Sequence, residues 1–151
     1  MCLINPKRIT TEEDIKCYKV LHKDAYDKLI SLFALPGSYQ VGRTRRLTKD
    51  LPLIRRWNNR QGELEYYIKE HSLYSFKELA DASKLAKHTI WNHCVIVECL
   101  IPHDSSFIYE GDTCLYNEFV CSSYASQKLK VTRIMFNCER DNGIMKIIPT
   151  E

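Results

Sequence analysis

The chain has 151 residues, of which 44% are hydrophobic and 27% are charged, and its net charge is +3. These proportions are typical of a globular domain and exclude a disordered or fibrous chain. No stretch approaches the roughly 18 apolar residues that a membrane-spanning helix needs, and the N-terminal residues do not resemble a signal peptide. We therefore expect a cytoplasmic protein with no membrane partner.

In chain order, the first half of the sequence predicts an extended leader over 1–13 and a strand over 15–21, which is β-branched, aromatic and alternating. Another strand is expected over 38–42, after a Pro-Gly turn. Two further places, 26–34 and 50–57, have apolar spacings that also fit a short helix.

The second half contains the helix that the sequence predicts best, over 76–87. Ser75 is the expected N-cap, and Glu78 three residues later would complete a capping box. Tyr74 and Leu79 could form a hydrophobic staple across this end of the helix. The cap should contribute about 1 kcal/mol, so Ser75→Ala would test it.

Residues 94–101 are nearly all apolar, which predicts a central strand covered on both faces and ended by Pro102. Further strands are expected over 106–109, 129–136 and 145–148, the last of them within a C-terminal tail, 137–151. The fold class that follows is α+β. We expect a single domain over 1–151, mainly an antiparallel twisted sheet with one principal helix.

The seven cysteines argue against a secreted disulfide framework. Their number is odd, and Cys17, Cys94, Cys99 and Cys121 lie within apolar runs, where a free cysteine behaves as a small hydrophobic residue. We expect reduced thiols in the cytosol. Cys94 and Cys99 are five residues apart and would point to opposite faces of one strand, so we expect no metal site.

The sequence predicts no cofactor and no obvious catalytic set. It contains neither a glycine-rich phosphate loop nor a nucleophile elbow. Glu98 is the residue to weigh, because it interrupts an otherwise apolar strand. Such a carboxylate has one of two roles. It is a structural group that reaches solvent or pairs with an arginine, or it is a functional acid with a perturbed pKa.

Charge is concentrated in a basic insertion, 43–60, which holds six arginines and one lysine against a single aspartate. Its net charge is +6, which leaves −3 for the rest of the chain and indicates an anionic partner. Arginine offers planar paired donors that fit phosphate, and an aromatic ring offers a stacking face for a base. The alternative is a solvated loop that only keeps the protein soluble. The predicted ligand-binding residues are Arg43, Arg45, Arg46, Arg55, Arg56, Trp57, His71 and Tyr74.

Four segments carry a resemblance to a family: EDIKCYKVL (13–21), HSLYSF (71–76) followed by KELADA, VIVECLIP (95–102) and SSYASQKLKV (122–131). They resemble a widespread, largely uncharacterised group of small proteins from gut Bacteroidetes and their phages. Members of that group typically have a short, glycine-containing connection in place of 43–60. We therefore expect the basic insertion to serve a function that is specific to this protein.

A looser resemblance runs to the ADP-ribosyltransferase fold, in which an aromatic strand feeds a helix like that of SLYSF-KELADASKLA. The strand that carries the catalytic glutamate in that fold corresponds to 122–131. This chain has no acidic residue there, and Gln127 lies near the expected position.

Three hypotheses follow. The first is a non-enzymatic, phage-type counter-defence protein that sequesters a phosphorylated nucleotide signal through its arginines, with a homo-oligomer expected from edge strands. The second is a divergent ADP-ribosyltransferase-like enzyme with Glu98 as the catalytic carboxylate. The third is an interaction protein whose basic insertion binds an acidic protein or RNA, nucleic acid being the less favoured partner.

Overall fold

The computed structural model describes residues 3–32, 37–48, 53–58, 64–70, 72–115 and 119–150. Over these residues the chain forms a 13-stranded sheet and one ten-residue helix, so the predicted α+β class is wrong and the protein is mostly β. The elements in chain order are β1 (Leu3–Arg8), β2 (Ile15–Lys23), β3 (Leu29–Ser31), β4 (Ser38–Tyr39), β5 (Thr44–Arg46), β6 (Leu53–Asn58), β7 (Leu64–Glu70), β8 (Leu73–Phe76), α1 (Leu79–His88), β9 (His93–Ile101), β10 (Ile108–Leu115), β11 (Phe119–Ser126), β12 (Lys128–Asp141) and β13 (Ile144–Pro149).

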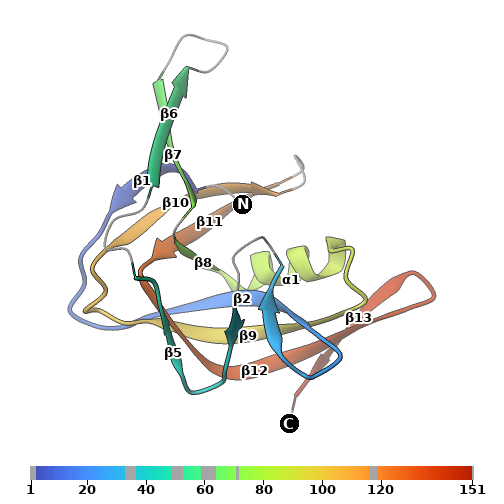
Figure 1. Ribbon diagram of the computed structural model, residues 1–151. Helices are drawn as coiled ribbons and strands as arrows, with labels where there is room; N and C mark the ends of the chain where they lie inside the picture. Colours follow the sequence, from blue (N-terminus) through green and yellow to red (C-terminus); the bar gives the residue numbers. More distant parts are fainter. Residues whose placement is uncertain are drawn as a thin grey trace.

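The strands follow the order β13-β12-β9-β2-β8-β11-β10-β1-β7-β6. Off this path, β3 pairs with β2 and β4, and β5 pairs with β12 beside β13. The sheet bends over itself, because residues of β2, β9 and β12 share a core with residues of β8, β10 and β11. Figure 1 shows the hairpin of β6 and β7 projecting away from the rest of the molecule.

Strand β9 is covered on both faces, as its apolar run predicts. One face packs in the main core between the two halves of the sheet, with Val95, Val97, Cys99 and Ile101. The other face packs under α1, where Cys94 and Ile96 meet Ala82, Leu85 and Ala86 of the helix. The helix therefore buries an apolar face against β9.

The predicted N-terminus of the helix is wrong by three residues. Ser75 lies in β8, opposite Tyr124 of β11, and Phe76 pairs with Tyr18 of β2. Strand pairing and burial of these residues outweigh the local capping signal. The N-cap is Glu78, which makes no side-chain capping hydrogen bond, so the predicted capping box does not form.

The two short helices expected within 26–34 and 50–57 are also wrong where they fall on described residues. The first segment contains β3, which pairs with β2 and β4, and the second contains most of β6, which pairs with β7. The leader predicted over 1–13 contains β1, a strand between β10 and β7. Strand pairing, which the apolar spacing does not encode, decides all three: β3 and β6 pair with strands next to them in the chain, and β1 pairs with distant ones.

Candidate functional site: an arginine-lined pocket

A pocket of about 400 Å³ lies beside the connection from β4 to β5. Its lining is polar and basic, and among the described residues it contains no carboxylate. The residues that line it are Ser38, Tyr39, Gln40, Arg43, Thr44, Arg45 and Arg46. Three of the eight predicted ligand-binding residues, the arginines at 43, 45 and 46, therefore meet around one cavity.

A tight turn and one strand pairing position these arginines. The Arg43 N–H donates to Gln40 O at 3.1 Å, which closes a β-turn, and Gly42 has the positive φ of 85° that its third position requires. The Gly42 N–H donates to Val131 O at 2.7 Å and so anchors the turn on β12. Strand β5 then runs antiparallel to the start of β12. The pocket thus rests on β12, a long strand that also pairs with β9 and β13.

Arg45 is held over the ring of Tyr39. Its guanidinium carbon lies 4.7 Å from the ring centroid, which is a cation–π contact, and Tyr39 is only 4% exposed. Gly37 packs close to the guanidinium group, because a Cβ on it would lie 2.8 Å from Arg45 Nη2. Arg45 is therefore ordered before any ligand arrives, which reduces the entropy lost on binding.

A second cation, Lys19 of β2, lies near the same ring. Its Nζ is 5.7 Å from the Tyr39 centroid and donates to Tyr74 O at 2.5 Å. Lys19 is 8% exposed and makes no ion pair within the described residues. A buried cation without a carboxylate partner raises the positive potential around Tyr39.

Arg43 and Arg46 are exposed and also lack ion pairs in the part of the chain that the structure describes. Arg43 donates to Gln40 Oε1 at 3.3 Å. Among the described residues no carboxylate competes for these two guanidinium groups, which can therefore donate to an anion in the pocket.

Tyr74 is not among the described residues that line the pocket. Its hydroxyl donates to Ile68 O at 2.5 Å, and its carbonyl accepts from Lys19. Arg55, Arg56 and Trp57 lie on β6, with side chains outside the described residues, and His71 is outside them altogether.

Glu98 is an ion-paired carboxylate on the other face of β9. Its neighbours Val97 and Cys99 belong to the core cluster that contains Tyr39, so Glu98 points away from the pocket. It accepts hydrogen bonds from Thr132 Oγ1 at 3.0 Å and Arg133 Nη2 at 3.2 Å. Burial raises the pKa of Glu98, but these hydrogen bonds and the charge of Arg133 outweigh it and lower the pKa. The sequence left two interpretations of Glu98 open, and the structure shows the carboxylate paired with an arginine.

Gln127, near the position that the transferase resemblance gives to a glutamate, is 1% exposed and serves as a structural clamp. Its Oε1 accepts from the Ser106 N–H at 3.1 Å, and its Nε2 donates to Leu47 O at 3.1 Å. The Leu47 N–H donates back to Gln127 O at 3.0 Å. Gln127 therefore fixes the residue that follows β5, and with it one end of the pocket wall.

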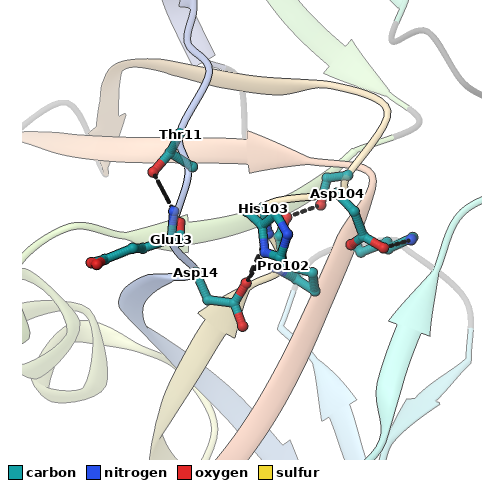
Figure 2. A network of polar contacts seen from close by, with 8 residues as sticks. Thr11, Glu13, Asp14, Pro102, His103 and Asp104 are labelled. Carbon is teal, nitrogen blue, oxygen red and sulfur yellow. Dashed lines mark hydrogen bonds and ion pairs between the residues drawn. The ribbon is translucent and has the colours of Figure 1, made fainter.

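An Asp–His pair lies where β2 begins and β9 ends. Figure 2 shows His103 and Asp14 pointing toward one another, and His103 donates its Nδ1–H at 2.8 Å and its backbone N–H at 2.9 Å to Asp14 Oδ1. These hydrogen bonds lower the pKa of Asp14. Ser105, in the same turn, donates its hydroxyl to Pro102 O at 2.7 Å. The pair ties this turn to the residue before β2.

Sequence reasoning missed Tyr39 and Lys19. The alternation of the strand expected over 15–21 places Lys19 on the same face as the buried Cys17 and Leu21, which could have marked it as a buried cation. Tyr39 follows Ser38 in a two-residue strand, too short for a pattern to show which face it takes.

The chain was compared with protein-family models, with curated proteins and with solved structures. None of these comparisons gave a match. Within the described ranges, no three or more histidine, cysteine or acidic side chains converge as metal ligands would. No helix among those residues is long and apolar enough to cross a membrane.

Proposed function

We propose that the protein binds a phosphorylated nucleotide in the arginine-lined pocket and holds it without converting it. The observation that carries this proposal is the meeting of Arg43, Arg45 and Arg46 around one cavity with no described carboxylate in its wall. Guanidinium groups donate paired hydrogen bonds to phosphate oxygens, and such charge-assisted bonds are about twice as strong as neutral ones.

The size and lining of the pocket support a small ligand rather than a polymer. Small-molecule sites usually enclose roughly 300–1,000 Å³, and this pocket encloses about 400 Å³. Ser38, Gln40 and Thr44 add hydroxyl and amide groups that can hydrogen-bond a sugar or a base. Arg45 lines the pocket, and the buried Lys19 lies near the ring of Tyr39, another lining residue. This concentration of positive charge favours a ligand with more than one negative charge.

Binding without turnover is supported by the chemistry of the wall. The described lining residues are arginines, hydroxyls and one amide, with no histidine, cysteine or carboxylate to act as a general base. Glu98, the acid of the enzymatic hypothesis, faces the other side of the sheet. We place this function in the cytoplasm, where the six described cysteines would stay free.

The biological role that we propose is sequestration of a nucleotide signal, as in phage counter-defence. It rests on the resemblance to small proteins of gut Bacteroidetes and their phages. Sequestration requires tight binding and no reaction, which agrees with the proposed pocket chemistry.

Native mass spectrometry tests the proposal. The purified protein is measured alone and with ATP, NAD, ADP-ribose, cyclic dinucleotides and unphosphorylated adenosine. We expect a phosphorylated compound to be retained with unchanged mass and adenosine not to be retained. The same spectra report the number of subunits, which tests the expected homo-oligomer. Conversion of NAD to a product would instead support the enzymatic hypothesis, and retention of none of these compounds would contradict the proposal.

A further inference from the structure

Two pairs of cysteines lie directly opposite each other on three adjacent strands, β2, β9 and β12. Cys17 of β2 faces Cys99 of β9, and Cys94 of β9 faces Cys138 of β12. Residues directly opposite in antiparallel strands have Cα atoms about 4.5–5.5 Å apart. This separation lies inside the roughly 4.4–6.8 Å that disulfides span. Both pairs can therefore be bridged with little movement of the backbone.

We propose that Cys94 and Cys138 are a site of reversible oxidation, which a peroxide converts to a disulfide joining β9 to β12. Cys94 would react first: its thiolate attacks one peroxide oxygen, which forms a sulfenic acid and releases hydroxide. The Cys138 thiol then displaces the oxygen of that sulfenic acid, which forms the S–S bond. The released oxygen takes up protons and leaves as water. In total the two thiols lose two electrons and two protons, and the peroxide is reduced to two waters.

The surroundings of Cys94 favour this order of events. The hydrogen bond from Cys138 lowers the pKa of Cys94, burial opposes this, and the charge of Arg140 lowers it further. The hydrogen bond that Cys138 makes with Cys94, together with burial, raises the pKa of Cys138, so Cys138 remains a thiol. A thiolate beside a resolving thiol is the arrangement found in cysteines that respond to oxidants.

Position in the fold gives Cys94 a route to a small oxidant. It is 2% exposed, but it is the second residue of β9, next to the exposed His93. The connection before β9 carries Ile90, which is 85% exposed. Opening the first residues of a strand costs less than opening its middle, so Cys94 can be reached without unfolding the sheet.

The second pair, Cys17 and Cys99, serves as an internal control of matched geometry. Both residues are 0% exposed and lie in the main core. The hydrogen bond with Cys17 and burial raise the pKa of Cys99 well above the ordinary value. We therefore expect this pair to stay reduced under conditions that oxidise Cys94 and Cys138.

The test treats the full-length protein with hydrogen peroxide, blocks the remaining thiols with N-ethylmaleimide and maps peptides without reduction. A Cys114→Ser background removes an exposed thiol that would compete for peroxide. We expect a peptide that links Cys94 to Cys138, lighter by two hydrogen atoms and lost on treatment with dithiothreitol. In a Cys138→Ser variant, we expect dimedone to label Cys94 as a sulfenic acid.

Several results would overturn the proposal. They are oxidation of Cys17 and Cys99 as fast as of the proposed pair, absence of the Cys94–Cys138 peptide while the protein remains folded, and dimedone labelling that does not include Cys94. Folding is followed in each sample by near-ultraviolet circular dichroism. If the Cys138→Ser variant does not fold, the dimedone experiment is left out. The peptide map of the Cys114→Ser protein then decides by itself which of the two cysteine pairs is oxidised.

Discussion

The clamp formed by Gln127 gives a sharp test of how the pocket wall is held. Gln127→Met keeps the volume of the side chain but removes the hydrogen bonds to the Ser106 N–H and to Leu47 O. Each partly buried group left without a partner costs about 1–3 kcal/mol. With two such groups, we expect the variant to be about 2–6 kcal/mol less stable. For a chain of this length that corresponds to a fall in Tm of roughly 5–20 °C.

Urea unfolding followed by circular dichroism measures this change, with an unchanged m-value showing that the unfolded state is not altered. Gln40→Met is the matched control, because Gln40 is exposed and its loss should change stability by less than about 0.5 kcal/mol. Gln127→Glu should also destabilise the protein, since a buried carboxylate cannot donate to Leu47 O, and it should not create NAD consumption. The reasoning is refuted if Gln127→Met unfolds at the same urea concentration as the wild-type protein.

Three further predictions concern stability and the enzymatic alternative. Ser75→Ala should leave Tm unchanged or raise it, because the buried Ser75 hydroxyl has no hydrogen-bond partner among the residues that the structure describes. A loss of stability near 1 kcal/mol would instead restore the capping hypothesis. Glu98→Gln should leave nucleotide affinity unchanged, as measured by calorimetry, because Glu98 faces away from the pocket; a large loss of affinity would contradict that placement. Asp14 has a folded-state pKa below the ordinary 3.8, owing first to the side-chain hydrogen bond from His103. Its stabilising contribution is therefore complete above about pH 4 and lost as the pH falls through the folded value. Asp14→Asn should flatten the acid side of a plot of Tm against pH, and an unchanged slope would show that the pair does not contribute.

The sequence predicts those elements whose pattern is repeated over a whole strand or helix. The apolar run of β9 indicates burial on both faces, and the stripe of Ala82, Leu85 and Ala86 indicates the buried side of α1. In both cases the local pattern and the tertiary contacts agree, so a short window contains enough information.

Elsewhere, contacts between distant segments override the local pattern. Tyr74 to Phe76 read as the start of a helix but are strand residues, because they pair with β11 and β2. In β12, register shifts between Val131 and Arg133 and between Ile134 and Phe136 break the regular alternation of faces along the strand. Ile134 consequently packs against the same main core as Val131, although regular alternation would place the two on opposite faces. A bulge inserts one residue and exchanges the two faces, which single-sequence alternation cannot show.

The site was predictable to the extent that it depends on charge. The basic insertion contains the three arginines of the pocket, and their concentration is visible in the sequence. Their convergence depends on the turn at Gly42 and on the pairing of β5 with β12, which join segments far apart in the chain. Tyr39 and Lys19 come together because the consecutive strands β2, β3 and β4 pair in order, which a two-residue strand such as β4 does not reveal in the sequence.

The most direct test of the arginine-lined pocket is isothermal titration calorimetry with the phosphorylated compound that the protein retains. Arg43→Gln and Arg46→Gln each remove one pocket guanidinium, whereas Arg133→Gln makes the same charge change on β12 beside Glu98, outside the pocket. A charged hydrogen bond contributes about 1.5–3 kcal/mol, and 1.4 kcal/mol is about tenfold in Kd. We predict that each pocket variant weakens binding roughly tenfold or more and that Arg133→Gln binds like the wild-type protein. Equal losses in all three variants, or no loss in the pocket variants, would contradict the account.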